Sequence, residues 1–437
     1  MRIPLAKLLL VAMLACGAVP RPAHAAEPDP WAYFGLYTLQ DGTLFHGGLL
    51  EEGDADIWIF GNPERPGLGG VYRKASATRF ESLLRPGQAL SFSELVDGQF
   101  QRIDLHATDG PAQTGRRGPR NTRRDVQIPA AGGTIGASLL APACRAPHPT
   151  VVFVNGSGRT TRQIGDFATF LLDQGMAVLV YDKRDGDPAT PGWQQQSLTE
   201  IGADAAAALA WAVAQPEIDP RRTGIFGSSQ GGWTGAMAAV GDPGADFLIV
   251  RAGPGVTETE ALLHETRNEL RAEGLAGTDL DKAMDLRREL YALAVQGRPI
   301  SEADALVAPW RDTPWYRKAF GDKPVSELWS ARWWGRAADS MSISPVPYLE
   351  RYDGPVLWFL GEDDENVPLV SSHAALSRTF ARMPGDDQTL VVLEDAPHSF
   401  VVDAQSPDAR YADDYLPTLR DWLATRTLSR RGCHAGK

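Results

Sequence analysis

The sequence predicts an α/β fold, in which a mostly parallel sheet carries helices on both faces and follows a small β-rich segment. Short apolar runs typical of buried strands alternate with helical patterns over residues 150–250, and such alternation indicates a parallel sheet. A Gly-x-Ser-x-Gly motif lies between one of these runs and the next helical pattern. Residues 37–60 carry short alternating runs broken by turn residues, as antiparallel strands do.

The first residues indicate a targeting segment rather than a part of the fold. Two basic residues precede an apolar run over 8–19, and Ala-His-Ala at 23–25 offers a cleavage site. We therefore expect a signal peptide over 1–25 and a periplasmic or secreted protein. Cys16 leaves attachment to lipid as the alternative. Beyond this segment no run is long and apolar enough to span a membrane, so we expect no stable membrane insertion.

The rest of the chain divides into two predicted domains. Residues 26–115 indicate a small β-rich domain that carries no recognisable chemistry, and the arginine-rich stretch 116–124 indicates a solvated basic linker. Residues 125–437 would form the second, main domain. Two long helical patterns and a stretch rich in tryptophan interrupt its alternation at about 257–341. We interpret this insertion as a helical cap.

The elements of the main domain follow one another in a regular order. Two runs, 125–129 and 134–142, are separated by Ala-Ala-Gly-Gly and predict an opening hairpin. Later apolar runs begin at residues 151, 176, 223 and 247, and helical patterns at 163–173, at 198–213 and after residue 230 lie between them. Helices that alternate with strands in this way cover both faces of the sheet.

Composition excludes several classes of partner. The formal net charge is −12, and the predicted signal peptide holds three basic residues and no acid, so its removal would leave −15. Such an acidic surface repels nucleic acid and anionic lipid. No cluster of cysteine, histidine and carboxylate residues has a metal-binding spacing. We expect a small-molecule substrate, no nucleic-acid partner, no metal and no cofactor, while protein partners and oligomeric state stay open.

The Gly-x-Ser-x-Gly motif places Ser229 between a strand and a helix. Residues 223–226 form a short strand-like run, and residues 231–240 are small and apolar, as a helix packed closely on a sheet requires. A tight turn there lifts the serine hydroxyl out of the backbone, where a base can reach it. We predict that Ser229 is a nucleophile. An ordinary glycine-rich turn is the alternative that the bare motif leaves open.

The other members of a catalytic triad should follow in the order acid, then histidine. The apolar run 354–360 ends in four consecutive carboxylates at 362–365, and the run 389–393 is followed closely by His398. Both loops would lie at the carboxyl edge of the sheet, where a triad acid and base belong. We predict that His398 is the base. The pattern selects the acidic loop but not one residue within it.

An oxyanion hole usually needs a second backbone donor from the loop after an earlier strand. Residues 150–154 indicate that strand, and two glycines flank Ser157 in the loop that follows it. We predict that the amides of Ser157 and Gln230 are the two donors. This loop lacks the glycine and lysine spacing of the known phosphate-binding motifs.

These motifs together resemble the α/β-hydrolase superfamily over roughly residues 123–430. More narrowly, the chain is similar to bacterial serine esterases related to dienelactone hydrolases, to acyl-CoA thioesterases and bile-acid acyltransferases, and to prolyl-oligopeptidase catalytic domains. The residues that carry the resemblance read Asn-Gly-Ser-Gly at 155–158, Tyr-Asp-Lys-Arg at 181–184, Gly-Ser-Ser-Gln-Gly-Gly at 227–232 and Gly-Glu-Asp-Asp-Glu-Asn-Val-Pro at 361–368. The family pattern Asp-x-x-Val-Pro implies that Asp364 is the triad acid.

The resemblance implies an α/β-hydrolase fold and catalysis through an acyl-enzyme. We predict a secreted serine hydrolase of carboxylic esters, in which Ser229 attacks, His398 transfers the proton and Asp364 orients the imidazole. A thioesterase, an acyltransferase or a peptidase would use the same residues. From a different class, a non-catalytic binding protein on a hydrolase scaffold is the alternative.

Three further features leave alternatives open. Cys144 and Cys433 can form a disulfide in an oxidising compartment. The run 181–184 would either contact a polar substrate or form an ion-pair network that fixes neighbouring loops, and we favour the network. The tryptophans of the insertion 257–341 would either line an acyl pocket or hold the insertion onto the main domain.

Overall fold

The structure is a computed structural model of the 437-residue chain. It describes residues 28–49, 57–61, 70–107, 111–118, 121–158, 162, 167–184, 192, 195–384, 387–404, 406 and 409–427. The predicted signal peptide, Cys16 and Cys433 lie outside these residues, whereas Cys144 lies within them and is disulfide-bonded. No helix in the described part of the chain has the length and apolar character that crossing a membrane requires.

The N-terminal part of the chain forms a closed antiparallel barrel, as the short alternating runs indicated. Its strands are β1 (Gly35–Leu39), β2 (Leu44–Leu49), β3 (Ile57–Gly61), β4 (Gly70–Ser76), β5 (Arg79–Ser82), β6 (Ala89–Val96), β7 (Gln99–His106) and β8 (Gln113–Arg117). Pairing of β8 with β1 closes the barrel, so it has no free sheet edge. Aromatic rings fill its core, namely those of Tyr33, Tyr37, Phe45, Phe60, Tyr72, Phe80, Phe92 and Phe100.

The arginine-rich stretch 116–124 differs from the solvated linker that we expected. Strand β8 ends at Arg117, and β9 (Thr122–Ala130) already begins within the stretch. The Arg117 side chain is half-buried and donates hydrogen bonds to the backbone carbonyls of Phe34 and Phe100, each at 2.6 Å. A guanidinium offers several donors in a fixed geometry, so this basic residue satisfies backbone acceptors at the end of the barrel.

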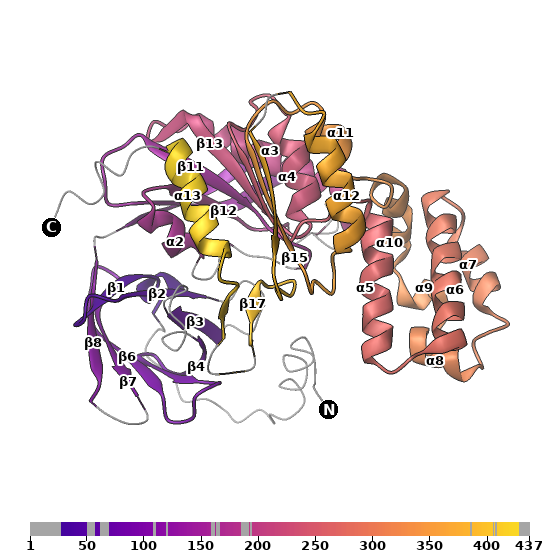
Figure 1. Ribbon diagram of the computed structural model, residues 1–437, viewed down its shortest axis with the longest axis horizontal. Coiled ribbons are helices and arrows are strands. Elements are labelled where there is room, and N and C mark those ends of the chain that lie inside the picture. The colour runs from indigo at the N-terminus through magenta and orange to yellow at the C-terminus, as the bar shows by residue number, and fades with distance from the viewer. Residues whose placement is uncertain are drawn as a thin grey trace.

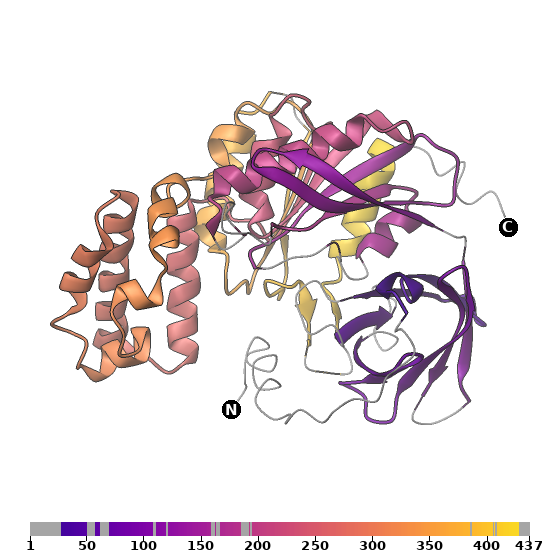
Figure 2. The ribbon, with the colours of Figure 1, turned by 180° about the vertical axis from the view of Figure 1, so that it is seen from behind.

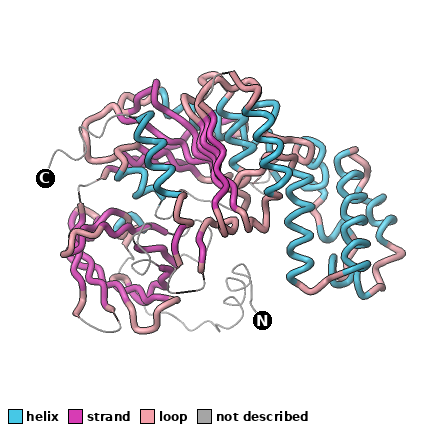
Figure 3. The backbone as a smooth tube through the Cα atoms, viewed as in Figure 1, coloured by secondary structure: helices cyan, strands magenta, loops and turns pink. Residues whose placement is uncertain are grey.

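The second domain is built on an eight-stranded sheet with the order β16-β15-β14-β13-β11-β12-β10-β9. The strands after β9 are β10 (Gly133–Ala141), β11 (His148–Val154), β12 (Ala177–Tyr181), β13 (Ile218–Ser228), β14 (Leu248–Arg251), β15 (Val356–Gly361) and β16 (Gln388–Leu393). Strands β11 to β16 are parallel, and the β9–β10 hairpin adds antiparallel strands at one edge. The predicted hairpin and parallel sheet are both present (Figure 3).

Helices cover both faces of this sheet (Figure 1). One face packs on α2 (Phe167–Asp173) and α13 (Tyr415–Thr427). The other packs on α3 (Leu198–Val213), α4 (Gly231–Ala239) and α12 (Leu369–Phe380), with the short α11 (Val346–Leu349) beside them. A hairpin of β17 (Val401–Val402) and β18 (Arg410–Tyr411) precedes α13. Helix α3 has the bounds that the sequence predicted, and burial of its alanine-rich face explains the clear pattern.

The insertion forms a helical bundle with its own core. Its helices are α5 (Glu258–Ala272), α6 (Gly277–Val295), α7 (Ile300–Val307), α8 (Pro314–Phe320), α9 (Val325–Leu328) and α10 (Ala331–Arg336), followed by the short η3 (Ala337–Asp339). Trp315 and Trp334 are buried in the bundle, and the rings of Trp329 and Trp333 lie 4.9 Å apart. These tryptophans therefore hold the insertion helices to one another.

The barrel and the insertion adjoin the sheet domain at different places (Figures 1 and 2). On the barrel side, His46 of β2 is buried, and its Nδ1 lies 3.2 Å from the Oγ1 of Thr169 on α2. Burial lowers the pKa of His46 to about 4, because an imidazolium loses its hydration there. Trp31 and Phe34, at the start of the barrel, pack on the apolar core beneath α2 and α13.

Candidate active site

Ser229 occupies the sharp turn between β13 and α4. Its φ is 51°, a left-handed conformation that is rare and strained for a residue with a side chain. A Cβ at Gly227 would lie 2.2 Å from the carbonyl oxygen of Gly231, and one at Gly231 would lie 2.2 Å from that of Val154. Gly227 is therefore required for the end of β13 to pack against the start of α4, and Gly231 for that start to pack against the end of β11.

Ser229, His398 and Asp364 form a hydrogen-bonded chain. The Nε2 atom of His398 lies 3.0 Å from the Oγ of Ser229. Its Nδ1 atom lies 2.9 Å from both carboxylate oxygens of Asp364. The Asp364 side chain is 1% exposed and that of His398 is 20% exposed. The structure thus brings together the serine and histidine that the motifs predicted with the acid that the resemblance implied.

The loop after β15 explains which of its four carboxylates faces the histidine. The Oδ1 atom of Asp364 accepts hydrogen bonds from the amides of Asn366 and Val367, both at 2.8 Å, and these bonds orient the carboxylate. Glu365 contributes differently, because its Oε2 accepts the backbone amide of His398 at 3.1 Å. One carboxylate therefore contacts the imidazole, and its neighbour holds the loop that carries the imidazole.

The site lies at the point where the strand order of the sheet reverses. The chain passes from β11 to β12 on one side and then returns to β13 on the other, and ligands bind at such switch points in open α/β sheets. Gly156 follows β11, and a Cβ there would be 3.3 Å from the Cβ of Ser229. The loop after β11 therefore runs directly beside the serine.

The two predicted oxyanion donors lie on either side of this switch point. Ser157 is exposed in the loop after β11, and Gln230 is half-buried at the start of α4. Among the residues that the structure describes, none accepts a hydrogen bond from the backbone amide of either residue. The N-terminus of α4 adds the positive end of the helix dipole. Both amides are thus available to an oxygen atom of a bound substrate.

The insertion contacts the acidic loop through α5. The Nε2 atom of His264 lies 3.3 Å from the carbonyl oxygen of Asp364, and the Nδ2 of Asn268 donates to the carbonyl oxygen of Glu365 at 2.8 Å. Neither residue was predicted from the sequence. Their spacing of four places them on one helix face, but nothing in the pattern indicates what that face meets.

A carboxyl group on the same helix is strongly perturbed. The pKa of Glu265 is raised to about 7, chiefly by burial and also by the negative charges of Glu269, Asp364 and Glu365, while His398 opposes the rise. Removal from water disfavours a carboxylate, and like charges add to that cost. The first helix of the insertion therefore places a titratable group within the electrostatic field of Asp364 and His398.

The ion-pair network that we favoured for residues 181–184 involves two of them. Asp182 pairs with Arg162 at 2.9 Å, and Arg184 pairs with Asp204 in a largely buried contact. Lys183, between them, instead donates to the loop after β11. In the sequence, the position of this run at the end of a strand indicated contacts at the sheet edge. It did not indicate that Lys183 has different partners from Asp182 and Arg184.

Arg251 is a further residue that sequence reasoning missed. It ends β14, and its guanidinium donates to the carbonyl oxygen of Ser399 at 2.6 Å and lies 3.5 Å from the Oγ of Ser228. The same group lies over the ring of Phe400, 5.5 Å from its centroid. Arg251 therefore connects the serine turn to the loop that carries His398.

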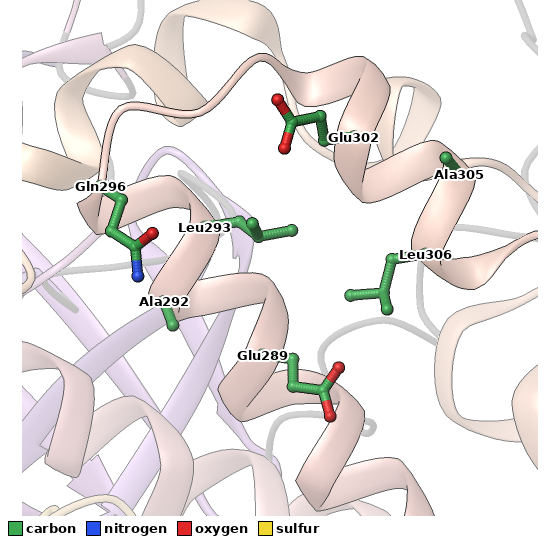
Figure 4. A pocket seen from close by; sticks show the side chains of 7 residues that line it. All are labelled: Glu289, Ala292, Leu293, Gln296, Glu302, Ala305 and Leu306. Atoms are coloured by element: carbon green, nitrogen blue, oxygen red, sulfur yellow. The ribbon is translucent and has the colours of Figure 1, made fainter.

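A separate shallow pocket lies within the insertion, between α6 and α7 (Figure 4). Its lining residues are Glu289, Ala292, Leu293, Gln296, Glu302, Ala305 and Leu306. None of them belongs to the loops at the end of the sheet. Within the described ranges, no group of three or more histidine, cysteine or acidic residues is arranged to hold a metal ion.

A model of a known protein family matches the greater part of the chain. The model described as serine aminopeptidase, S33, matches residues 145–405, a stretch that covers more than half of the chain and contains Ser229, Asp364 and His398. The chain belongs to this hydrolase family. The α/β-hydrolase fold and the hydrolase class predicted from the motifs are thereby confirmed.

Curated relatives match only a part of the chain. An uncharacterized protein of Mycobacterium tuberculosis is 30% identical over 151 residues, which cover 29% of this chain and 52% of that protein. The quorum-quenching protein AidA of Acinetobacter baumannii is 34% identical over 110 residues, covering 25% of this chain and 36% of that protein. The chain thus spans about half the length, or less, of these relatives.

Solved structures resemble the chain at lower identity. An esterase of Pyrococcus furiosus has a TM-score of 0.45 and 18% identity, covering 70% of this chain and 91% of that one. A puromycin-hydrolyzing peptidase of Mycobacterium tuberculosis has a TM-score of 0.44 and 17% identity, covering 90% of this chain and 54% of that one. The family match, rather than these likenesses, supports the hydrolase assignment.

Proposed function

We propose that the protein is an exported serine hydrolase that cleaves carboxylic esters through an acyl-enzyme. The observation that carries this proposal is the hydrogen-bonded chain from Ser229 through His398 to Asp364 at a strand–turn–helix. A serine, an imidazole and a buried carboxylate in this order are the groups that nucleophilic acyl transfer needs. The hydrolase family of the chain supports the same reaction class.

In the first half of the proposed reaction, the Oγ of Ser229 attacks the ester carbonyl carbon while His398 Nε2 takes the hydroxyl proton. His398 then gives this proton to the leaving alcohol as the carbon–oxygen bond breaks, which leaves the acyl group on Ser229. In the second half, water attacks the acyl carbon while His398 takes a proton from the water. The bond from the acyl carbon to the Oγ of Ser229 then breaks, His398 returns the proton to that Oγ, and the carboxylic acid is released. Asp364 orients the imidazole and stabilises its charged form throughout.

The amides of Ser157 and Gln230 would hold the oxygen that becomes negative in each tetrahedral intermediate. Each amide faces no other acceptor among the described residues, so neither needs to break a bond before the reaction. Losing one such donor typically costs about 3 kcal/mol of transition-state stabilisation. The loop after β11 would therefore contribute as much as a catalytic side chain.

Export is a separate part of the proposal. The basic and apolar start of the chain with a small-residue cleavage site supports a signal peptide over 1–25. The disulfide bond of Cys144 is consistent with an oxidising compartment. A periplasmic or secreted enzyme accounts for both features. Detection of the mature N-terminus by mass spectrometry of the periplasmic fraction tests this part.

A peptidase is the second candidate, because the matching family model describes serine aminopeptidases. It would use the same three residues and differ in the leaving group, which would be an amine rather than an alcohol. The insertion would act as a cap in either case, since α5 contacts the loop of Asp364. A capped site favours small acyl groups, so we expect short esters to be the better substrates.

The test is hydrolysis of p-nitrophenyl esters from acetate to palmitate beside a series of amino-acid p-nitroanilides, with labelling by a fluorophosphonate probe. Ser229→Ala should lower kcat by about 10⁴-fold or more and abolish labelling. Ser377→Ala, at an exposed position of α12, makes the same chemical change away from the site and should leave both unchanged.

Three outcomes would contradict the proposal in different ways. Faster turnover of anilides than of esters would establish the peptidase. Faster turnover of long-chain than of short-chain esters would contradict the small capped site. Absence of both turnover and labelling in the wild-type protein would favour a binding protein on a hydrolase scaffold.

A further inference from the structure

Lys183 is a buried cation beneath the loop that carries one predicted oxyanion donor. It follows β12 and is 7% exposed. Its Nζ donates hydrogen bonds to the carbonyl oxygens of Gly156 and Gly158, the latter at 3.2 Å. It also donates to the side-chain oxygen of Gln230 at 3.0 Å. One ammonium therefore contacts both the loop after β11 and the residue after the serine.

The bond to Gly156 has a geometric consequence for Ser157. The carbonyl of Gly156 and the amide N–H of Ser157 belong to one peptide unit, which is planar and trans, so the two groups point in opposite directions. When Lys183 holds the carbonyl oxygen, the N–H is directed away from Lys183. Gly156 itself lies beside Ser229, because a Cβ there would be 3.3 Å from the serine Cβ. Gly156 thus lies beside both the cation and the predicted nucleophile.

The same bond strengthens Ser157 as a donor. A hydrogen bond from a charged group is about twice as strong as a neutral one, and it draws electron density toward the carbonyl oxygen. Hydrogen bonds in a chain polarise one another, so the N–H at the other end of the peptide unit becomes more positive. Preorganised dipoles of this kind act where negative charge develops in the transition state.

Lys183 also contacts Gln230, the residue that carries the second predicted donor. Its side-chain oxygen accepts from Lys183, while its backbone amide, at the start of α4, is the second predicted donor. An ammonium offers three donors that radiate from one point, which suits it to join acceptors from two different loops. Movement of the loop after β11 away from the serine turn would have to break these bonds.

The neighbours of Lys183 show that this arrangement is specific to one residue of the run. Asp182 and Arg184 flank it in the sequence, and they pair with Arg162 and Asp204 respectively. The first pair joins two loop residues, and the second joins the loop after β12 to α3. Of the three residues, only Lys183 donates to the carbonyl oxygens of Gly156 and Gly158.

We propose that Lys183 is the positioning residue of the oxyanion hole. It orients and polarises the Ser157 amide and fixes the position of Gln230 relative to that amide. The inference rests on the proposed function. Lys183 does not touch the reacting atoms, and its contribution is expressed only when an oxyanion forms. Its replacement should therefore affect kcat and leave KM nearly unchanged.

The experiment compares Lys183→Met and Lys183→Arg with Arg184→Met, which removes the neighbouring cation. Steady-state kinetics on p-nitrophenyl acetate give kcat and KM. Inhibition constants are measured for a trifluoromethyl ketone, whose carbonyl carbon forms a bond with the Ser229 Oγ and whose oxygen becomes an oxyanion. The matching secondary alcohol, which has no carbonyl to attack, reports binding without an oxyanion. Thermal unfolding of each variant reports stability.

Lys183→Met should lower kcat by about 10²-fold to 10³-fold, the effect of losing one oxyanion donor, and weaken the ketone by a similar factor. Its affinity for the alcohol and its KM should change less than threefold. Lys183→Arg keeps the charge and should recover part of the loss. Arg184→Met should lower the unfolding temperature without changing the ratio of ketone to alcohol affinity.

The inference is overturned if Lys183→Met weakens the ketone and the alcohol equally, or if its kcat matches that of the wild type. Loss of kcat in both Lys183→Met and Arg184→Met, in proportion to their loss of stability, would also overturn it. Failure of the proposed function is a distinct result: the wild-type protein would then neither hydrolyse the ester nor be labelled at Ser229.

Discussion

The N-terminal barrel and the carboxyl edge of the sheet are built by different rules. In the barrel, strand β1 alternates buried and more exposed side chains, and the ring of Phe92 contacts the rings of Tyr33, Phe60 and Phe80. At the sheet edge, polar groups from loops far apart in the sequence meet around Ser229. In the barrel, the period-two pattern of strand residues produces an apolar core. At the sheet edge, the loops that follow the strands bring polar side chains together.

Polar groups illustrate the same difference. In the barrel, Arg117 donates to the hydroxyl of Tyr37 at 2.6 Å as well as to backbone carbonyls, and burial raises the pKa of Tyr37 far above its usual value. These groups satisfy one another. At the edge, Ser229, His398 and Asp364 are likewise hydrogen-bonded to one another, but the backbone amides of Ser157 and Gln230 face no described acceptor. A closed core stabilises the fold, and an open set of donors can bind a reacting oxygen.

The largest effect is expected for a substitution that disturbs the hydrogen bonds linking Asp364, His398 and Ser229 at the sheet edge. Asp364→Asn should lower kcat by about 10⁴-fold, because an amide holds the imidazole in the wrong tautomer, and it should leave the fold intact. Asp363→Asn, at the exposed neighbouring position, is the matched control and should leave kcat unchanged. Equal losses in the two variants would show that the loop, rather than the buried carboxylate, is what matters.

The next effect concerns the barrel core. Phe92→Ala should lower the free energy of unfolding by about 3–5 kcal/mol, because it leaves a cavity among aromatic rings, while kcat of the folded protein stays unchanged. Leu95→Ala lies on the same strand, 52% exposed, and should change stability by less than about 0.5 kcal/mol. Urea unfolding measures both. A fall of kcat in Phe92→Ala below half its wild-type value would show that barrel and site are coupled.

The smallest effect concerns the buried carboxyl beside the site. The pKa of Glu265 rises from 4.5 to about 7 on folding, so the folded state binds more protons than the unfolded state between these values. The stability that Glu265 contributes is therefore fully present below pH 4.5 and is lost as the pH rises through 7. Glu265→Gln should be more stable than the wild type by about 1–3 kcal/mol at pH 8 and equal to it at pH 4.5.

Unfolding curves of the wild type and the variant at several pH values test this sign. Glu269→Gln, at an exposed position of the same helix, provides the control and should show a much smaller change. A difference that grows toward low pH instead would contradict the burial of the Glu265 carboxyl. That result would mean that Glu265 on α5 is not close to Asp364 and Glu365.

Local patterns predicted most of the fold. The hairpin, the parallel strands and helix α3 have short-range causes, because burial on one or both faces produces a periodic sequence. The linker expected at 116–124 was the main difference, since Arg117 lies in β8 and contacts the barrel. Arginine in a glycine-rich stretch indicates solvent by composition, but its donors can equally satisfy carbonyls that only the folded barrel brings together.

The sequence by itself predicted the serine turn, the two later loops that hold the acid and the histidine, and the fold class, because each motif and each helix or strand pattern can be recognised from neighbouring residues. Only the tertiary structure decided which groups support the site. Lys183 and Gly156 are 27 residues apart, His264 and Asp364 are 100 apart, and Arg251 and Ser399 are 148 apart. Contacts at such separations depend on which strand ends become neighbours in the sheet, and no local pattern carries that information.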